Sequence, residues 1–198
     1  MATHGLGLAV SLAVFPVLVF LGARRGDPMV LVGVTIFAAA MVSVFAASTL
    51  YHAMPPGPRR QMWRRLDQTA VYLLIAGTYT PFMLGVVRGP WGWTILALVW
   101  VIALTGIAFK LGLRCESPKL ELATYLGMGW LAVLVFQPLV RGIGWAGFAW
   151  LLAGGLVYSI GTIFLTCQSR LRYGHCAWHV AVLGGSACHT IAVVHYGM

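Results

Sequence analysis

Apolar segments of about twenty residues follow one another along nearly the whole chain, and they constrain its fold more than any other feature. A bilayer with a hydrocarbon core about 30 Å thick is spanned by roughly 20 residues of α-helix. Because the backbone groups of such a segment find no water in lipid, the segment must satisfy them internally. Seven runs reach or approach the required length, at about 5–23, 29–54, 68–87, 91–112, 121–140, 143–167 and 176–197.

These runs predict an all-α membrane protein, a seven-helix transmembrane bundle that forms a single domain over residues 1–198. The length of the runs and the absence of period-two alternation exclude a sheet. The composition agrees, since 60% of the 198 residues are hydrophobic and only 9% are charged. A soluble domain of this size has too little interior to bury so many apolar side chains.

Lys and Arg residues lie mainly between the apolar runs and give the chain a formal charge of +9. This placement is typical of membrane-flanking charges, so no nucleic-acid partner is expected. Basic residues favour cytoplasmic loops, and the count predicts a cytoplasmic N-terminus and an external C-terminus, although Arg24 and Arg25 in the first loop argue the other way. The nine inner residues are Arg59, Arg60, Arg64, Arg65, Lys110, Arg114, Lys119, Arg170 and Arg172, and the four outer residues are Arg24, Arg25, Arg88 and Arg141.

Polar side chains from three of the predicted helices fall at one membrane depth. The second helix ends in "STLYH", which places Ser48 and His52 near the inner face. The third helix begins at that face just after Asp67, and the last helix begins there with His175 and His179. Placing an ionisable side chain, including an imidazole, inside a membrane costs free energy, and such side chains are usually functional. Their coincidence therefore indicates a site.

The spacing of His175 and His179 suits a metal ion. Residues four apart lie on one face of a helix, so both imidazoles can reach the same ion, and His52 can supply a third nitrogen. Three histidines and a water form an open tetrahedral zinc site of the catalytic kind. Ser48, one turn before His52, is placed to contact the bound water, and Asp67 is placed to orient that water or take its proton.

Structural interpretations of the same residues remain open. A histidine pair four residues apart also arises by chance, and a carboxylate such as Asp67 at a helix start can cap free N–H groups. His189 lies ten residues beyond His179, about 15 Å along a helix, too far for a metal–nitrogen bond of about 2 Å. We therefore interpret His189 as a packing residue and His195, which is farther still, as an interfacial one.

The cysteines show no arrangement that indicates a metal site or a disulfide framework. They form no CxxC pair. We expect them to pack between helices. They are Cys115, Cys167, Cys176 and Cys188.

The motifs occur in an order that resembles a known family. They are "STLYH" with Asp67 fifteen residues later, "LIAGTYTPF", "GLVYSIGTIF" and "HCAWH" followed by a distal histidine. Together they resemble the haemolysin III family, the bacterial branch of the progestin and adipoQ receptor superfamily. The resemblance extends from "THGLG" at Thr3 to the last helix.

The resemblance implies a seven-helix bundle in the bacterial inner membrane, with Zn²⁺ near the cytoplasmic face. It implies His52, His175 and His179 as the zinc ligands, with Asp67 and Ser48 as polar partners of the metal-bound water. Two residues depart from the family pattern, but neither is a proposed ligand. Gln68 stands where a histidine is common, and Cys176 stands where Glu or Gln is usual.

Several functions remain open on this evidence. The resemblance implies a ceramidase-like, zinc-dependent hydrolase whose substrate is a membrane lipid, a sphingolipid or another lipid amide or ester. The alternative is a non-enzymatic sensor or regulator of membrane homeostasis in which zinc is structural. A pore-forming haemolysin is disfavoured because no amphipathic strand pattern is present. A bis-histidine haem protein is disfavoured because only His52 is available opposite the pair on the last helix.

Overall fold

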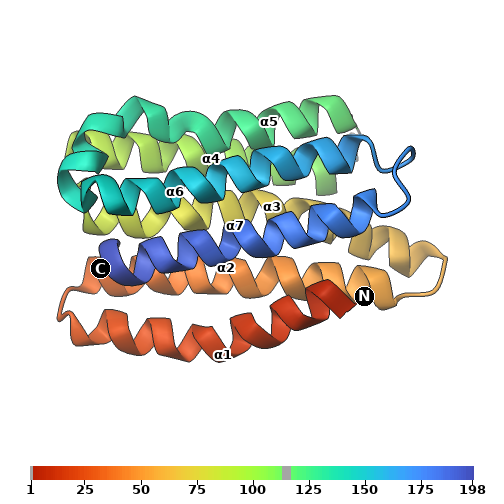
Figure 1. Ribbon diagram of the computed structural model, residues 1–198, viewed down its shortest axis with the longest axis horizontal. Coiled ribbons are helices and arrows are strands. Elements are labelled where there is room, and N and C mark those ends of the chain that lie inside the picture. Colours follow the sequence, from red (N-terminus) through yellow and green to blue (C-terminus); the bar gives the residue numbers. More distant parts are fainter. Residues whose placement is uncertain (1, 113–116) are drawn as a thin grey trace.

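The computed structural model describes residues 2–112 and 117–198, and all regular structure in these residues is helical (Figure 1). The expected all-α class is thus confirmed. The elements are α1 (Ala2–Arg24), α2 (Pro28–Ala53), α3 (Pro58–Gly85), α4 (Pro90–Leu111), α5 (Pro118–Trp130), the 3₁₀ helix η1 (Leu131–Val135), α6 (Phe136–Thr166) and α7 (Gly174–Tyr196).

Proline marks the start of four of these helices. Pro28, Pro58, Pro90 and Pro118 each occupy the first turn, where a missing N–H costs no hydrogen bond and the fixed φ suits a helix. In α2 the carboxylate of Asp27 also accepts a hydrogen bond from the N–H of Met29, at 2.9 Å. The turns between the apolar runs are therefore set by local chemistry.

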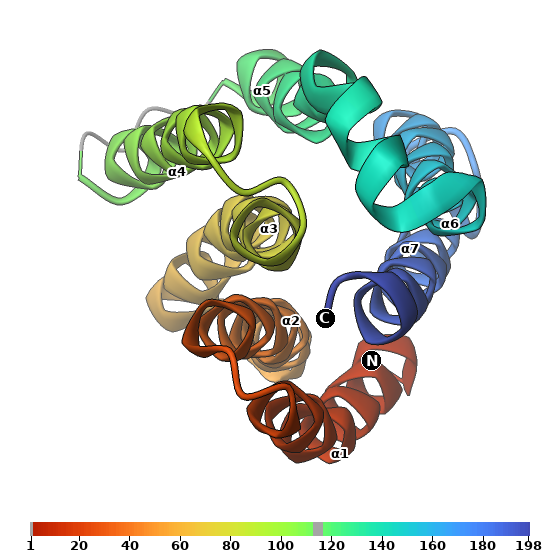
Figure 2. The same ribbon diagram turned by 90° about the vertical axis from the view of Figure 1, so that its left-hand side faces the viewer.

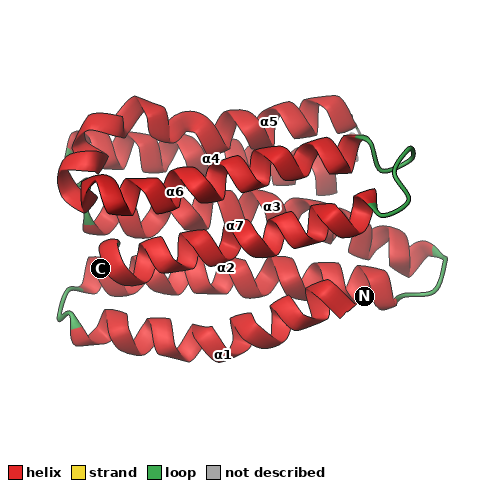
Figure 3. Ribbon diagram, viewed as in Figure 1, coloured by secondary structure: helices red, strands yellow, loops and turns green. Residues whose placement is uncertain are grey.

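The helices form a ring when the bundle is viewed along its axis (Figure 2). Each helix packs on its neighbour in the sequence, and α7 closes the ring by packing against both α6 and α1. The loops lie at the two ends of the bundle (Figure 3). The chain's N-terminus, the end of α2 and the starts of α3 and α7 share one end.

Close backbone contact joins α2 to α3. A Cβ atom on Gly33 would lie 2.7 Å from the Cα of Pro81, and one on Gly77 would lie 2.7 Å from the Cβ of Ala40. Small residues allow such close approach between membrane helices. The contact holds α3 against the helix that carries Ser48 and His52.

The helical stretch 118–166 differs from the two separate spans that the apolar runs predict. It is helical from Pro118 to Thr166, and its sharp break is at Gly144, which has φ 69°. A left-handed φ costs little free energy for glycine but is strained for other residues. The chain therefore turns at Gly144 and not at Arg141, where the apolar runs are interrupted. Upstream, the hydroxyl of Tyr79 accepts from the N–H of Ala132 and donates to the carbonyl of Met128, each at 2.8 Å, and so satisfies backbone groups at η1.

The third helix also begins earlier than the apolar pattern predicts. It starts at Pro58 rather than near residue 68, because the basic segment before Asp67 is helical too. The α3 helix is not among the helical stretches that are long and apolar enough to span a membrane, because even its part after Asp67 contains Gln, Thr, Tyr, Gly and Pro residues. The described residues contain five such stretches, at Thr3–Arg24, Pro28–Ala53, Pro90–Leu111, Pro118–Thr166 and Gly174–Tyr196.

Ion pairs tie helices at both ends of the bundle. Lys110 of α4 contacts Glu121 of α5 at 2.9 Å, and both side chains are nearly buried. At the opposite end Arg88 pairs with Asp27, and this hydrogen bond holds the pKa of the Asp27 carboxyl below its usual value. These contacts fix the relative positions of the helices without entering the histidine site.

The cysteines that the structure describes are free. Cys167, which follows the end of α6, and Cys188 of α7 are partly buried, whereas Cys176 is exposed on α7. Cys115 and the basic residue Arg114 lie outside the described residues.

The close contact between α2 and α3 leads to a prediction about the stability of the fold. Gly33→Ala should lower the free energy of unfolding by about 1–3 kcal/mol, because its methyl group meets backbone atoms that cannot rotate away. Thermal unfolding of the purified protein in detergent measures the change. Gly127→Ala is the matched control, since a Cβ there meets nothing within 4 Å and alanine is the better helix former. Equal melting temperatures for Gly33→Ala and the wild type would contradict the prediction.

Candidate metal centre

Three histidines from α2 and α7 converge at the end of the bundle that holds the N-terminus. The Nε2 atom of His175 lies 3.1 Å from that of His52 and 2.9 Å from that of His179. One ligand atom from each residue lies within 4.8 Å of the other two. The predicted meeting of these three side chains is therefore observed.

Helix geometry explains the convergence. His175 and His179 occupy successive turns of α7 and share one face, as their spacing predicts. His52 lies in the last turn of α2, which ends at the same level. His179 is buried, His52 is partly buried and His175 is partly exposed, so the site lies close to the end of the bundle.

Two oxygen atoms set which ring nitrogens face inward. His175 Nδ1 lies 2.8 Å from Oε1 of Gln168, and His179 Nδ1 lies 3.3 Å from Oγ1 of Thr3. The amide oxygen of Gln168 can only accept, so Nδ1 of His175 donates to it and Nε2 of neutral His175 carries no proton. The same holds for His179 in the tautomer that donates to Thr3. Histidines that bind metals characteristically donate their second ring nitrogen in this way.

The donor set fits a divalent cation. Ring nitrogens 2.9 and 3.1 Å apart either share a proton in an N–H···N hydrogen bond or surround a common cation. Tetrahedral coordination with metal–nitrogen bonds of about 2.0–2.1 Å places nitrogens about 3.3 Å apart, close to the observed separations. Imidazole ligands suit zinc, copper, iron and nickel, so the three residues define a site for a metal ion without selecting the element.

A cavity of about 720 Å³ opens beside the histidines. The side chains of Ser48, Asp67 and His175 line it at the site, and apolar side chains of α3, α5, α6 and α7 line most of the remainder. Ser48 is 1% exposed, and its hydroxyl interacts with the side chain of Asp67 without forming a hydrogen bond of normal geometry. Ser48 and Asp67 thus lie on the wall of the cavity, while the converging cluster itself consists of the three histidines.

Sequence reasoning assigned no role to Thr3 or His4, both of which belong to this neighbourhood. Thr3 contacts His179, and the ring of His4 stacks on His179 with centroids 3.7 Å apart. Their position within the "THGLG" motif was the available signal, but no spacing rule links the start of α1 to α7. The other two histidines lie outside the cluster: His189 contacts the carbonyl of Leu151 at 3.2 Å and lines the same cavity, and His195 is exposed.

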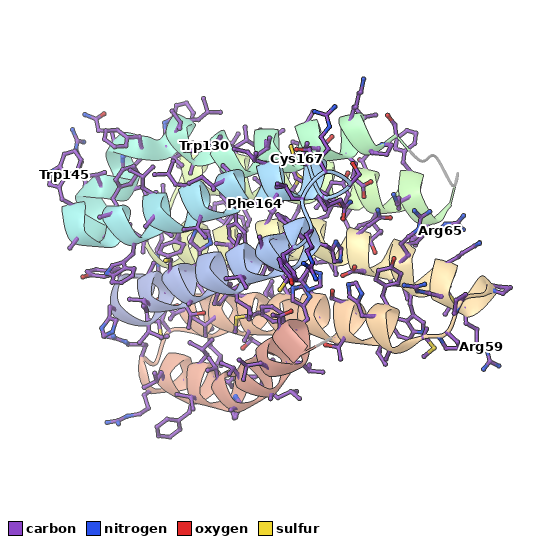
Figure 4. The ribbon with its side chains drawn as sticks, turned by 45° about the vertical axis from the view of Figure 1, so that its right-hand side comes forward. Arg59, Arg65, Trp130, Trp145, Phe164 and Cys167 are labelled. Carbon is purple, nitrogen blue, oxygen red and sulfur yellow. The ribbon has the colours of Figure 1, made fainter. Side chains whose placement is uncertain are left out.

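Basic side chains surround the histidine end of the bundle. Figure 4 shows Arg59 and Arg65 projecting at this end, with Trp145 at the opposite end. Most of the described Lys and Arg residues lie at the end of the bundle that holds the three histidines, because the helices that carry them begin or end there. The site therefore lies at the more positive end of the molecule.

Comparison with known proteins gives matches over nearly the whole chain. The family described as "Haemolysin-III related" matches residues 1–190. Hemolysin-3 of Bacillus cereus is 39% identical over 194 residues, which cover 98% of this chain and 88% of that protein. The Hemolysin-3 homolog of Bacillus subtilis (strain 168) is also 39% identical over 194 residues, 98% of this chain and 91% of that protein.

A human protein matches more distantly. Monocyte to macrophage differentiation factor is 24% identical over 166 residues, 81% of this chain and 68% of that protein. This similarity is consistent with the wider superfamily that the motifs indicate. No solved structure matches the chain.

The geometry predicts that all three histidines are needed to retain a metal ion. Elemental analysis of purified protein should find about one transition-metal ion per chain in the wild type, and much less in His52→Ala, His175→Ala and His179→Ala. His195→Ala is the control, because this residue is exposed near the far end of α7. Full metal content in any one of the three variants would exclude that residue as a ligand.

The contact between Thr3 and His179 gives a second prediction. Thr3→Val should weaken metal affinity about 10–100-fold, because the isosteric side chain cannot accept the Nδ1 proton of His179. Thr3→Ser retains the hydroxyl and should restore most of the affinity. Competition with a coloured chelator measures both variants. Equal affinities for Thr3→Val and the wild type would show that the hydroxyl does not orient His179.

Proposed function

The chain belongs to the haemolysin III family, and from that premise we propose that it is an integral membrane zinc hydrolase acting on an amide or ester bond of a membrane lipid. One observation carries the proposal. Three convergent imidazoles lie beside a cavity of about 720 Å³ that is polar at their end and apolar along most of its length. A cavity of this kind suits a molecule with one polar head and a long chain.

The proposed chemistry assigns a role to each polar residue at the site. Zinc held by His52, His175 and His179 supplies Lewis acidity toward the scissile carbonyl. The carboxylate of Asp67 accepts the proton of the attacking water as general base. The buried hydroxyl of Ser48 interacts with Asp67 and helps to position that carboxylate toward the water. The apolar walls take up the acyl chain and exclude bulk water.

We further propose seven membrane crossings with the metal centre at the cytoplasmic face of a bacterial inner membrane. The break at Gly144 divides the stretch Pro118–Thr166 into two segments, and the apolar part of α3 after Asp67 supplies another crossing. The excess of Lys and Arg at the histidine end supports a cytoplasmic N-terminus and an external C-terminus. Cysteine-scanning accessibility on both sides of the membrane tests this arrangement.

A non-enzymatic role is the second candidate, and the packing of α7 favours it. This helix packs chiefly against α6 and α1, so a metal ion bound by His52, His175 and His179 would tie α7 to α2. Metal binding coupled to helix association is stabilising by itself. In that case the protein senses or regulates membrane state, and the metal holds its bundle together.

The two candidates differ in what metal removal does. For the hydrolase, purified protein incubated with ceramides and other acyl lipids should release free fatty acid, measured by mass spectrometry. Asp67→Asn should reduce the rate by at least about 100-fold at unchanged metal content, because it removes the general base. No release by the metal-loaded wild type, together with a sharp fall in melting temperature on chelation, would replace the hydrolase with the structural role.

A further inference from the structure

Residues 58–66, the first turns of α3, form a basic segment to which the proposed chemistry assigns no role. The segment contains four arginines and no acidic residue. Figure 1 shows it extending beyond the start of α7, at the end of the bundle that holds the three histidines. Figure 2 shows it at the outside of the ring of helices, between α2 and α4. The basic segment therefore lies at the periphery of the bundle.

Apolar side chains lie among the arginines of this segment. Met62 is 52% exposed and Trp63 is partly exposed. Because they come three and four residues after Arg59, they share one side of the helix with it. Helices at a lipid–water boundary combine basic side chains, which contact head groups, with aromatic and apolar side chains that enter the layer beneath. The exposed surface of the basic segment has this composition.

The course of α3 favours a lipid as the partner of this surface. The helix runs without a break from the basic segment into the bundle, and its buried residues begin at Thr69. At 1.5 Å per residue, the nine residues of the segment occupy about 14 Å of helix. The arginines thus adjoin the lipid that surrounds the bundle, whereas a soluble anion would have to reach them between the head groups.

Two of the four arginines are placed to bind an external anion. Arg59 is exposed and projects from the end of the bundle (Figure 4). Arg60 is partly exposed, and its guanidinium carbon lies 5.2 Å from the centroid of the Tyr51 ring. This cation–π contact orders the side chain of Arg60, which reduces the entropy that binding would cost. Arg64 and Arg65 take part in other interactions.

We infer that the basic segment binds an anionic phospholipid of the surrounding leaflet, with Arg59 and Arg60 on its phosphate and with Met62 and Trp63 against its acyl chains. Guanidinium groups pair with phosphate oxygens through two parallel hydrogen bonds. A zwitterionic lipid also carries an ammonium group, which repels arginine, so the surface prefers a lipid with net negative charge. The site lies outside the cavity beside the histidines and does not depend on hydrolysis.

Native mass spectrometry of the purified protein, titrated with phosphatidylglycerol or with phosphatidylcholine of the same acyl chains, tests the inference. The wild type should bind phosphatidylglycerol more tightly. The double variant Arg59→Gln, Arg60→Gln should weaken that binding about 25-fold, since one arginine near an anionic surface contributes about fivefold. The matched control is Arg24→Gln, Arg25→Gln, an exposed pair at the other end of the bundle in which Arg24 also contacts an aromatic ring, that of Phe20 at 5.8 Å. It should bind phosphatidylglycerol like the wild type.

Each of four results would overturn the inference. The first is equal affinity of the wild type for the two lipids, and the second is wild-type affinity for phosphatidylglycerol in the Arg59, Arg60 variant. The third is an equal loss in both double variants, which would indicate net charge alone. The fourth is binding of free glycerol phosphate as tight as that of the lipid, which would assign the arginines to a soluble anion.

A single substitution keeps the test valid if the double variant does not fold. Arg60 contacts Tyr51, whereas Arg59 is exposed, so Arg59→Gln should leave the melting temperature and the metal content unchanged. It should weaken the binding of phosphatidylglycerol about fivefold. Unchanged affinity in this variant would also overturn the inference.

Discussion

The convergence of three imidazole nitrogens on one point is the constraint on which the functional end of this molecule depends. His52, His175 and His179 bring their Nε2 atoms together from α2 and α7, two helices separated by most of the chain. Contacts of the Nδ1 atoms with Gln168 and Thr3 hold the rings of His175 and His179 in this orientation. A cation at their centre would join α2 to α7, so that metal binding and helix association would be coupled at this end.

A cavity beside the three histidines makes the site accessible to a ligand. A metal centre in a tightly packed bundle would serve only as a cross-link, but here about 720 Å³ of space adjoins it. Polar groups of Ser48, Asp67 and His4 gather at the metal end, while apolar side chains cover most of the other walls. The contacts that shape this space lie elsewhere: Gly33 against Pro81 holds α3 to α2, and the hydroxyl of Tyr79 satisfies the interrupted backbone near η1.

Sequence patterns predicted the parts of the fold that depend on local chemistry. The i, i+4 histidine pair and the apolar runs have local causes, and the pair and most of the runs have their counterpart in the structure. The boundaries of α3 and the course of the chain between Pro118 and Thr166 were less predictable. Hydropathy indicates which segments can lie in lipid. A helix ends where the backbone can no longer form helical hydrogen bonds or adopt helical φ angles, as at Gly144.

By itself, the sequence determined the helical class, the family and the one face of α7 that carries His175 and His179, because helix periodicity and motif order are properties of the chain. Only the tertiary structure decided that Thr3 contacts His179, that His4 stacks on it, and that both adjoin a cavity. These contacts join residues about as far apart in the chain as its length allows. They arise from the packing of α1 against α7, and no local spacing rule encodes that packing.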